Sequence, residues 1–175
     1  MLLLASHIKQ LPIVSMETGR QVAVIIDFLI NHSNLGLLAF ICHDRKNRRL
    51  ILMGHDIRFI ARDCILINDF ETLSEADDIA RLPTMVANQF NPLDKQVSTQ
   101  NGQKLGRVID YAINLDTSYI QKLYARPTFF QSRFHDQMII DRSQIIELTD
   151  KTIIVQDSTE LVSSAANVNA ARMSS

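Results

Sequence analysis

Three His-Asp pairs are the residues whose types could support hydrolytic chemistry. They are His43-Asp44, His55-Asp56 and His135-Asp136. His and Asp side chains that converge on a divalent metal ion can activate water against a phosphate ester. Such sites usually sit on helices with further ligands at set spacing, whereas all three pairs fall at expected strand ends or turns. A metal-dependent hydrolase is therefore kept only as a remote alternative, and we assign no catalytic, cofactor or metal site.

Two carboxylates stand inside apolar segments, Asp27 in VAVIIDFLI and Asp110 in RVIDYAIN. One interpretation is a pair of perturbed carboxylates that performs acid–base catalysis. The other is structural: each accepts hydrogen bonds from turn amides or from a nearby Arg and so fixes a corner of the fold. We favour the structural interpretation, because a buried carboxylate must be either paired or protonated.

The densest basic run is Arg45, Lys46, Arg48 and Arg49. It could contact phosphate groups of RNA or of lipid head groups. The alternative is a solvated hairpin tip, which the neutral sequence around the run favours. No aromatic residue stands beside the run to stack on a base, which weakens an interpretation as a single-stranded RNA site.

Aromatic and basic residues also gather in an expected loop near residue 130. The candidate partner-binding residues there are Arg126, Phe129, Phe130, Arg133 and Phe134. Aromatics and Arg with few acidic neighbours are typical of interface anchors. The alternative is that the loop folds back and its rings cap the core.

The overall composition is that of a globular protein. The chain has 175 residues, of which 46% are apolar and 21% charged, with a formal net charge of -1. No global basic field would attract nucleic acid or anionic lipid. Cys42 and Cys64 form no CxxC pair, so we expect two buried thiols in a reducing cytosol. The N-terminal apolar run is short and no run is long enough for a membrane span, which predicts a cytoplasmic location.

An internal duplication organises the elements that must position these residues. The segment 14–31, VSMETGRQVAVIIDFLIN, aligns without gaps to 97–114, VSTQNGQKLGRVIDYAIN, with seven identities where chance gives about one. In each copy a turn that contains a glycine, Gly19 or Gly102, precedes an apolar strand.

β-branched and aromatic runs separated by turns predict short strands throughout both copies. We expect strands at 6–10, 22–30, 37–43, 50–53, 64–68, 104–114, 119–126, 137–140, 143–147 and 152–156. A single helical turn is expected within 57–62. A helix is expected at 73–82, with Ser74 as its N-cap and Pro83 as its stop.

The predicted fold class is all-β, mainly, as two tandem small β-barrels joined by a short helical linker. The first barrel covers 1–70, the linker 71–93 and the second barrel 94–158. The tail 159–175 is expected to be a frayed helix or disordered. Closed or nearly closed barrels are expected because closure protects strand edges in units of this size.

The order of these motifs resembles the PRC-barrel family, known from the H subunit of photosynthetic reaction centres and from a ribosome maturation factor. The second copy carries the pattern at Gly102, Leu105, Gly106, Val108 and Asp110. The first copy keeps Gly19, Val22, Ile25 and Asp27 but has Ala23 in place of the second glycine. Gly19, Asp27, Gly102, Gly106 and Asp110 are therefore the expected turn and corner residues.

The resemblance implies a docking or adaptor module, as PRC-barrels are in the settings named above. The fold alone does not specify the role, because these barrels are similar in fold but not in role. We expect a non-enzymatic adaptor or scaffold that binds a protein partner, or itself, without a cofactor. The alternative is an RNA- or ribosome-associated assembly factor, which rests on the family resemblance and on the basic run.

Overall fold

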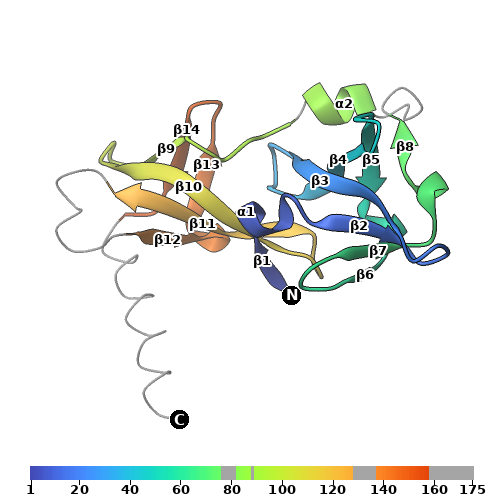
Figure 1. Cartoon of the computed structure of the whole chain (residues 1–175). Coiled ribbons are helices and arrows are strands. Elements are labelled where there is room, and N and C mark those ends of the chain that lie inside the picture. The colour runs from blue at the N-terminus through green and yellow to red at the C-terminus, as the bar shows by residue number, and fades with distance from the viewer. Residues whose placement is uncertain (76–81, 88, 128–136, 158–175) are drawn as a thin grey trace, which may run out of the picture. The chain divides into compact units, whose positions relative to one another are not determined.

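The computed structural model describes residues 1–75, 82–87, 89–127 and 137–157. These residues are mainly β-strand, which confirms the all-β class. The chain divides into two compact units, whose strands are labelled in Figure 1. The first unit comprises Met1–Asn91 together with Ile113–Ile120, and the second comprises Pro92–Ala112 and the chain from Gln121 onward.

The first unit is built on one seven-stranded sheet. Its hydrogen-bonded order is β6 (Ile57–Ile60), β7 (Ile65–Ile67), β2 (Pro12–Ser15), β3 (Gln21–Ile30), β4 (Leu37–Asp44), β5 (Arg49–Met53) and β8 (Ser74–Glu75). The β2–β7 pair is parallel and the other pairs are antiparallel. Its described helical elements are α1 (Ala5–Ile8), the 3-10 turns η1 (Gly54–Asp56) and η2 (Phe70–Thr72), and α2 (Leu82–Ala87).

The second sheet repeats this order. It runs β12 (Met138–Asp141), β11 (Tyr119–Pro127), β10 (Lys104–Asn114), β9 (Gln96–Thr99), β14 (Thr152–Val155) and β13 (Ile145–Leu148), with the 3-10 turn η4 (Arg142–Gln144) before β13. Its parallel pair is β9–β14, which corresponds to β2–β7. The strand β1 (Leu2–Leu4) pairs with β10 outside this path. The duplicated sequence therefore folds into the same strand order twice.

The hairpin between β10 and β11 ends inside the first unit. The Leu37 N–H donates to the Ser118 carbonyl at 2.7 Å, and the Ile120 N–H donates to the Leu35 carbonyl at 3.0 Å. The Leu115 N–H also donates to the Met1 carbonyl at 2.9 Å. Residues 113–120 are thus part of the hydrogen bonding of the first unit.

Apolar residues of β3, β4 and β5 form a buried cluster in the core of the first unit. Leu29, Ala39, Ile41 and Ile51 pack as one buried cluster. Burial of a Leu or Ile side chain contributes about 1.5–3 kcal/mol, so this cluster accounts for the positions of the central strands. The expected strands 22–30 and 104–114 are confirmed as β3 and β10.

The structure contains a curled half-barrel sheet, and the strand order of each sheet is an open path. In the described part of the chain, the end strands β6 and β8 are not paired with each other, and neither are β12 and β13. None of these four end strands is longer than four residues. Short edges expose few unpaired backbone groups.

The turn before the long strand differs by one residue between the copies. Gly19 and Gly102 both take positive φ, 64° and 80°, as the turn assignment predicts. The Gly19 N–H donates to the Ser15 carbonyl, whereas the Gly102 N–H donates to the Thr99 carbonyl. In the parallel pairs, Ser15 lies opposite Ile67 and Thr99 lies opposite Val155. Ser15 therefore corresponds to Thr99, and the gapless alignment is one residue out of register before the turn.

Two predictions in the first copy are wrong. The segment 6–10 was expected to be a strand, but Ala5–Ile8 is α1, with Ala5 and Ile8 both buried. Burial at this spacing suits one face of a helical turn. The segment 57–62 was expected to be a helical turn, but Ile57–Ile60 is β6, and the helical turn comes just before it, at Gly54–Asp56.

The predicted helix at 73–82 is also wrong where the structure describes it. Ser74 lies in strand β8, opposite Ile51 of β5, so it is no N-cap. Pro83 lies inside α2 rather than after a helix. Proline is tolerated in the first turn of a helix, because its missing N–H would have no partner there.

No helix among the residues that the structure describes is long and apolar enough to cross a membrane.

Candidate functional site

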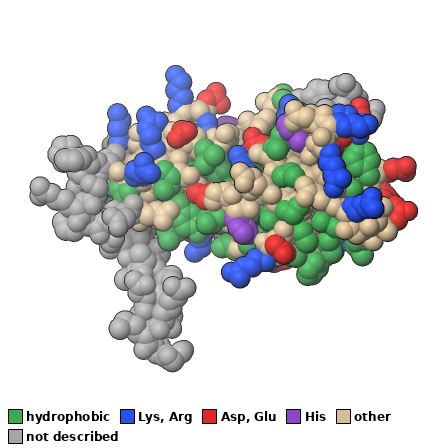
Figure 2. Space-filling view, viewed as in Figure 1, with side chains coloured by type: hydrophobic (Ala, Val, Ile, Leu, Met, Phe, Trp, Pro, Cys, Tyr) green, Lys and Arg blue, Asp and Glu red, His purple; other side chains and the backbone are tan. Residues whose placement is uncertain are grey.

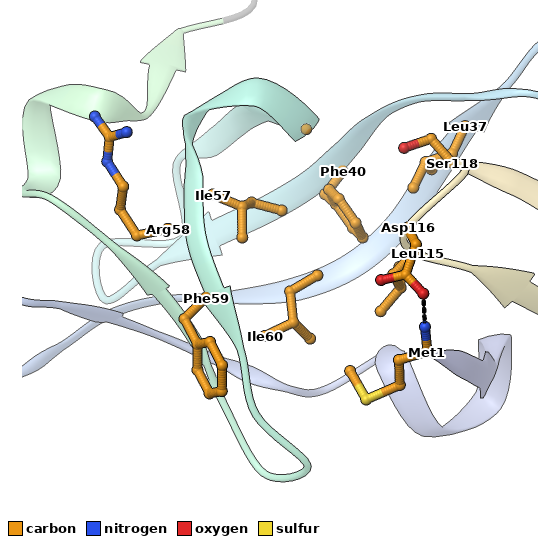
Figure 3. Close-up of a pocket in the computed structure, with 11 residues that line it drawn as sticks. Met1, Leu37, Phe40, Ile57, Arg58, Phe59, Ile60, Leu115, Asp116 and Ser118 are labelled. Carbon is orange, nitrogen blue, oxygen red and sulfur yellow. Dashed lines mark hydrogen bonds and ion pairs between the residues drawn. The ribbon is translucent and has the colours of Figure 1, made fainter.

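An apolar groove beside strand β6 is the strongest candidate site in the described chain. Figure 3 shows it, and we call it the β6 groove. Its volume is about 490 Å³, and all of its lining residues belong to the first unit. The apolar lining residues are Leu37, Phe40, Ile57, Phe59, Ile60 and Leu115.

The side chains of β6 divide between the groove and its rim. Ile57 and Ile60 extend toward the ring of Phe40, whereas Phe59 extends away from them (Figure 3). The Phe59 side chain is 61% exposed, and Phe40 is only 1% exposed. Apolar side chains also reach the surface along the lower edge of the first unit, where Figure 1 labels β6 and β7 (Figure 2). An exposed ring beside an apolar hollow is typical of an interaction surface.

Strand β6 is an edge of its sheet, which leaves backbone groups on its outer side. The Ala61 N–H donates to the Cys64 carbonyl at 2.9 Å and closes the turn between β6 and β7. Because hydrogen-bonding groups alternate along an antiparallel strand, the Ile60 N–H and C=O face away from β7. The groove thus has a hydrogen-bonding edge as well as an apolar lining.

Polar groups at the groove are held by other residues of the first unit. The Arg58 Nε donates to the Asn68 side-chain oxygen at 2.8 Å. The Met1 amino group forms an ion pair with the exposed Asp116 carboxylate, drawn as a dashed line in Figure 3. The groove thus combines apolar side chains with polar groups that are already paired within the first unit.

The predicted basic run forms the tip of the β4–β5 hairpin. All four cations are exposed. Arg48 forms ion pairs with Asp44 and Glu75, at 2.8 Å and 3.0 Å, and its guanidinium lies 5.5 Å from the centre of the Phe70 ring. Arg48 therefore stabilises the hairpin, whereas Arg45, Lys46 and Arg49 form no ion pair with any described residue.

Hydrogen bonds set the charge of Asp44. Desolvation acts to raise its pKa, but bonds from the Arg48 amide and guanidinium and from the Lys46 amide outweigh it and lower the pKa below the ordinary value. The Arg48 side-chain bond to Asp44 likewise raises the pKa of the guanidinium. Both groups remain charged throughout the neutral range.

Of the two strand carboxylates, Asp27 belongs to the first unit and Asp110 to the second. Asp27 forms an ion pair with Lys9 at 2.9 Å, and its side chain is 42% exposed. Asp110 accepts a hydrogen bond from the Tyr111 N–H at 2.8 Å. Asp27 is thus half-exposed and paired with a lysine, where the sequence suggested a buried corner paired with an arginine or with turn amides.

The two His-Asp pairs that the structure describes lie at separate places. His43-Asp44 ends β4, and His55-Asp56 lies in η1, with 3.5 Å between the two side chains. The pair at 135–136 falls outside the described residues. Within the described ranges, no three His, Cys, Asp or Glu side chains come together in a group that could hold a metal ion.

The predicted aromatic loop falls largely outside the described residues. Phe129, Phe130, Arg133 and Phe134 cannot be placed, and Arg126 is exposed near the end of β11. The β6 groove was not predicted from the sequence. The segment IRFI gave no sign that Phe59 is exposed, because a short apolar run fits a buried or an edge position equally well.

The chain matches no known protein family, and it matches no curated protein.

Proposed function

We propose that this protein is a non-enzymatic adaptor that binds a partner protein along the β6 groove. The observation that carries the proposal is the 61% exposed Phe59 on an edge strand beside an apolar hollow. An extended apolar segment of the partner would add to β6 as a further strand. Main-chain hydrogen bonds then supply affinity, and the groove selects the side chains that it accepts.

The second unit supports this assignment by contrast. Its strand β13 corresponds to β6. Glu147 pairs with β14 at the same register at which Phe59 pairs with β7, so Glu147 occupies the position of Phe59. A charge on an edge strand discourages pairing with another chain. The second copy thus has a charge that disfavours strand pairing at the position where the first copy exposes an aromatic ring.

The resemblance to PRC-barrels is consistent with an adaptor, because members of that family serve as docking modules. We infer membership from the motif order and from the repeated strand order. A cytoplasmic setting is the one we propose, since Cys42 and Cys64 are both free thiols.

A photo-crosslinking amino acid at position 59 tests the groove in the native cell. We expect position 59 to capture a distinct protein, with loss of that capture when Ile60→Glu is added. The same amino acid at Ile146, which is 44% exposed on β13, is the matched control. Capture of the same proteins from both positions, or of none from position 59, would refute the proposal.

Crosslinking from the same positions distinguishes self-association from binding to a different protein. A crosslink from position 59 to a second copy, together with a sedimentation coefficient that Phe59→Glu lowers, would identify the partner as the protein itself. The aromatic loop remains a separate prediction. If it anchors a partner, Phe130→Ala with Phe134→Ala should remove that partner, and an unchanged set of partners would exclude the loop.

A further inference from the structure

The tip of the β4–β5 hairpin, Asp44–Arg49, is held in one conformation by a single carboxylate. The Asp44 Oδ1 accepts hydrogen bonds from the Lys46 N–H at 2.9 Å and from the Arg48 N–H at 2.8 Å. The Asn47 N–H donates to the Asp44 carbonyl at 3.0 Å, and Asn47 takes a φ of 62°. The side chain of Asp44 is only 5% exposed, whereas the tip residues that donate to it lie at the surface. The tip therefore presents its cations on a preorganised backbone.

The four cations of this tip have two different roles. Arg48 is neutralised by Asp44 and Glu75 and covers the ring of Phe70. Arg45, Lys46 and Arg49 are exposed and have no carboxylate partner among the described residues. Among the described residues, two carboxylates thus meet four cations, and the excess positive charge there lies on three neighbouring side chains.

We propose that Arg45, Lys46 and Arg49 bind the phosphate backbone of a nucleic acid duplex without sequence preference. Exposed cations that face no carboxylate can release counterions from phosphates, which supplies non-specific affinity. A duplex is favoured over a single strand because the ring that the tip is seen to contact, Phe70, is already covered by Arg48. A lipid surface is disfavoured because the tip, DRKNRR, has no apolar side chain to insert.

This binding goes beyond the adaptor function and does not depend on it. The tip lies on β4 and β5, whereas the β6 groove takes only Leu37 and Phe40 from these strands. A failure of the crosslinking experiment at position 59 would leave the prediction for the tip intact. A failure of duplex binding would likewise leave the groove intact.

Salt-dependent duplex binding by the full chain tests the proposal. Short RNA and DNA duplexes with a fluorescent label are titrated, and the affinity is measured by anisotropy at several salt concentrations. With three phosphate contacts on B-form DNA, the slope of log affinity against log salt is expected to be about -2.7. Each neutralised cation should reduce the magnitude of that slope by about one. The variant is R45Q with K46Q and R49Q, which leaves Arg48 and the hairpin intact.

The matched control removes the same number of charges elsewhere. It carries R20Q, K104Q and K151Q, three exposed cations outside the tip. We expect the tip variant to lose at least about tenfold in affinity at low salt, and the control to bind like the unaltered protein. The duplex that binds more tightly, RNA or DNA, identifies the source of the phosphates.

Three outcomes would overturn the proposal. The first is that the unaltered protein binds neither duplex at low salt. The second is that the tip variant and the control lose affinity equally, which would indicate a general charge effect. The third is binding to phosphatidylserine vesicles but to neither duplex, with loss of that binding in the tip variant.

Discussion

Gly106 of β10 and the backbone carbonyl of Arg126 approach each other so closely that a Cβ atom at residue 106 would lie 2.2 Å from the carbonyl oxygen. The obstacle is backbone, so it cannot swing aside as a flexible side chain can. Local steric crowding therefore explains why residue 106 is a glycine in the second copy. The first copy has Ala23 at the equivalent position, 2% exposed, and accommodates the methyl group there.

Replacement of this glycine should destabilise the second unit. We expect Gly106→Ala to lower the free energy of unfolding by about 1–3 kcal/mol, the usual cost of forcing extra atoms into a packed site. Urea denaturation measures the loss. Gly54→Ala is the control, since a Cβ there meets nothing within 4 Å and its φ is ordinary. Equal effects of the two substitutions would contradict the steric argument.

Acid should weaken the β4–β5 hairpin through Asp44. Its pKa lies below the ordinary value of 3.8, because hydrogen bonds from Arg48 and Lys46 outweigh desolvation. A carboxyl group with a lowered pKa in the folded state stabilises the fold at pH values above the unfolded pKa. This contribution is lost as the pH falls through the folded pKa.

The comparison is between the unaltered protein and Asp44→Asn. The difference between their urea midpoints should be constant near neutral pH, shrink as the pH falls below about 3.8, and disappear in stronger acid. A carbon-13 NMR titration of the Asp44 carboxyl gives the folded pKa directly. A difference in midpoint that does not change with pH would show that the charge of Asp44 is irrelevant to stability.

The two cysteines should differ in reactivity toward thiol reagents. Burial raises the pKa of the Cys42 thiol to about 12, and the side chain is fully shielded. Cys64 is only half-buried, so the prediction of two buried thiols is wrong for this residue. In a Cys64→Ser variant, Cys42 is the remaining thiol. We expect it to react with Ellman's reagent at pH 8 only as fast as the fold around it opens. Rapid reaction of that variant in native buffer would be inconsistent with the packing of β4.

The ion pair between Lys9 and Asp27 should contribute little to stability. Both side chains are partly exposed, at 28% and 42%, so water screens the attraction. We expect Asp27→Ala to cost about 0.2–1 kcal/mol and to leave oligomeric state and crosslinked partners unchanged. A double-mutant cycle with Lys9→Met isolates the pair energy. A coupling of several kcal/mol would mean that the carboxylate is buried in solution.

Long β-branched runs made much of the fold predictable from the sequence. VAVIIDFLI and the segment from Lys104 to Asn114 have no competing helical pattern, and both are strands. The parallel strands β2 and β9 were missed, because each is four residues long and its pairing is with β7 or β14, far along the chain. Such short elements are determined by tertiary pairing rather than by local propensity.

The candidate sites were predictable only in part. The basic run could be located, but the division between Arg48 and its neighbours depends on Glu75, which lies 27 residues away and is brought close by the β5–β8 pair. Phe59 gave no signal, because exposure on an edge strand depends on which strands find partners. Sequence periodicity specifies which residues share a face, but not whether that face is covered.

The segment Ile113–Ile120, between the body of β10 and that of β11, belongs to the first unit. No single cut in the chain therefore separates the two units. A fragment that ends at Asn91 would retain Leu35 and Leu37 but lose the Ser118 and Ile120 backbone groups that bond to them. A fragment that begins at Pro92 would keep a tip whose hydrogen-bonding partners are gone. The two copies thus have similar folds, but the first unit includes backbone hydrogen-bond partners that lie in the sequence of the second copy. Neither copy is therefore expected to fold completely when it is expressed alone.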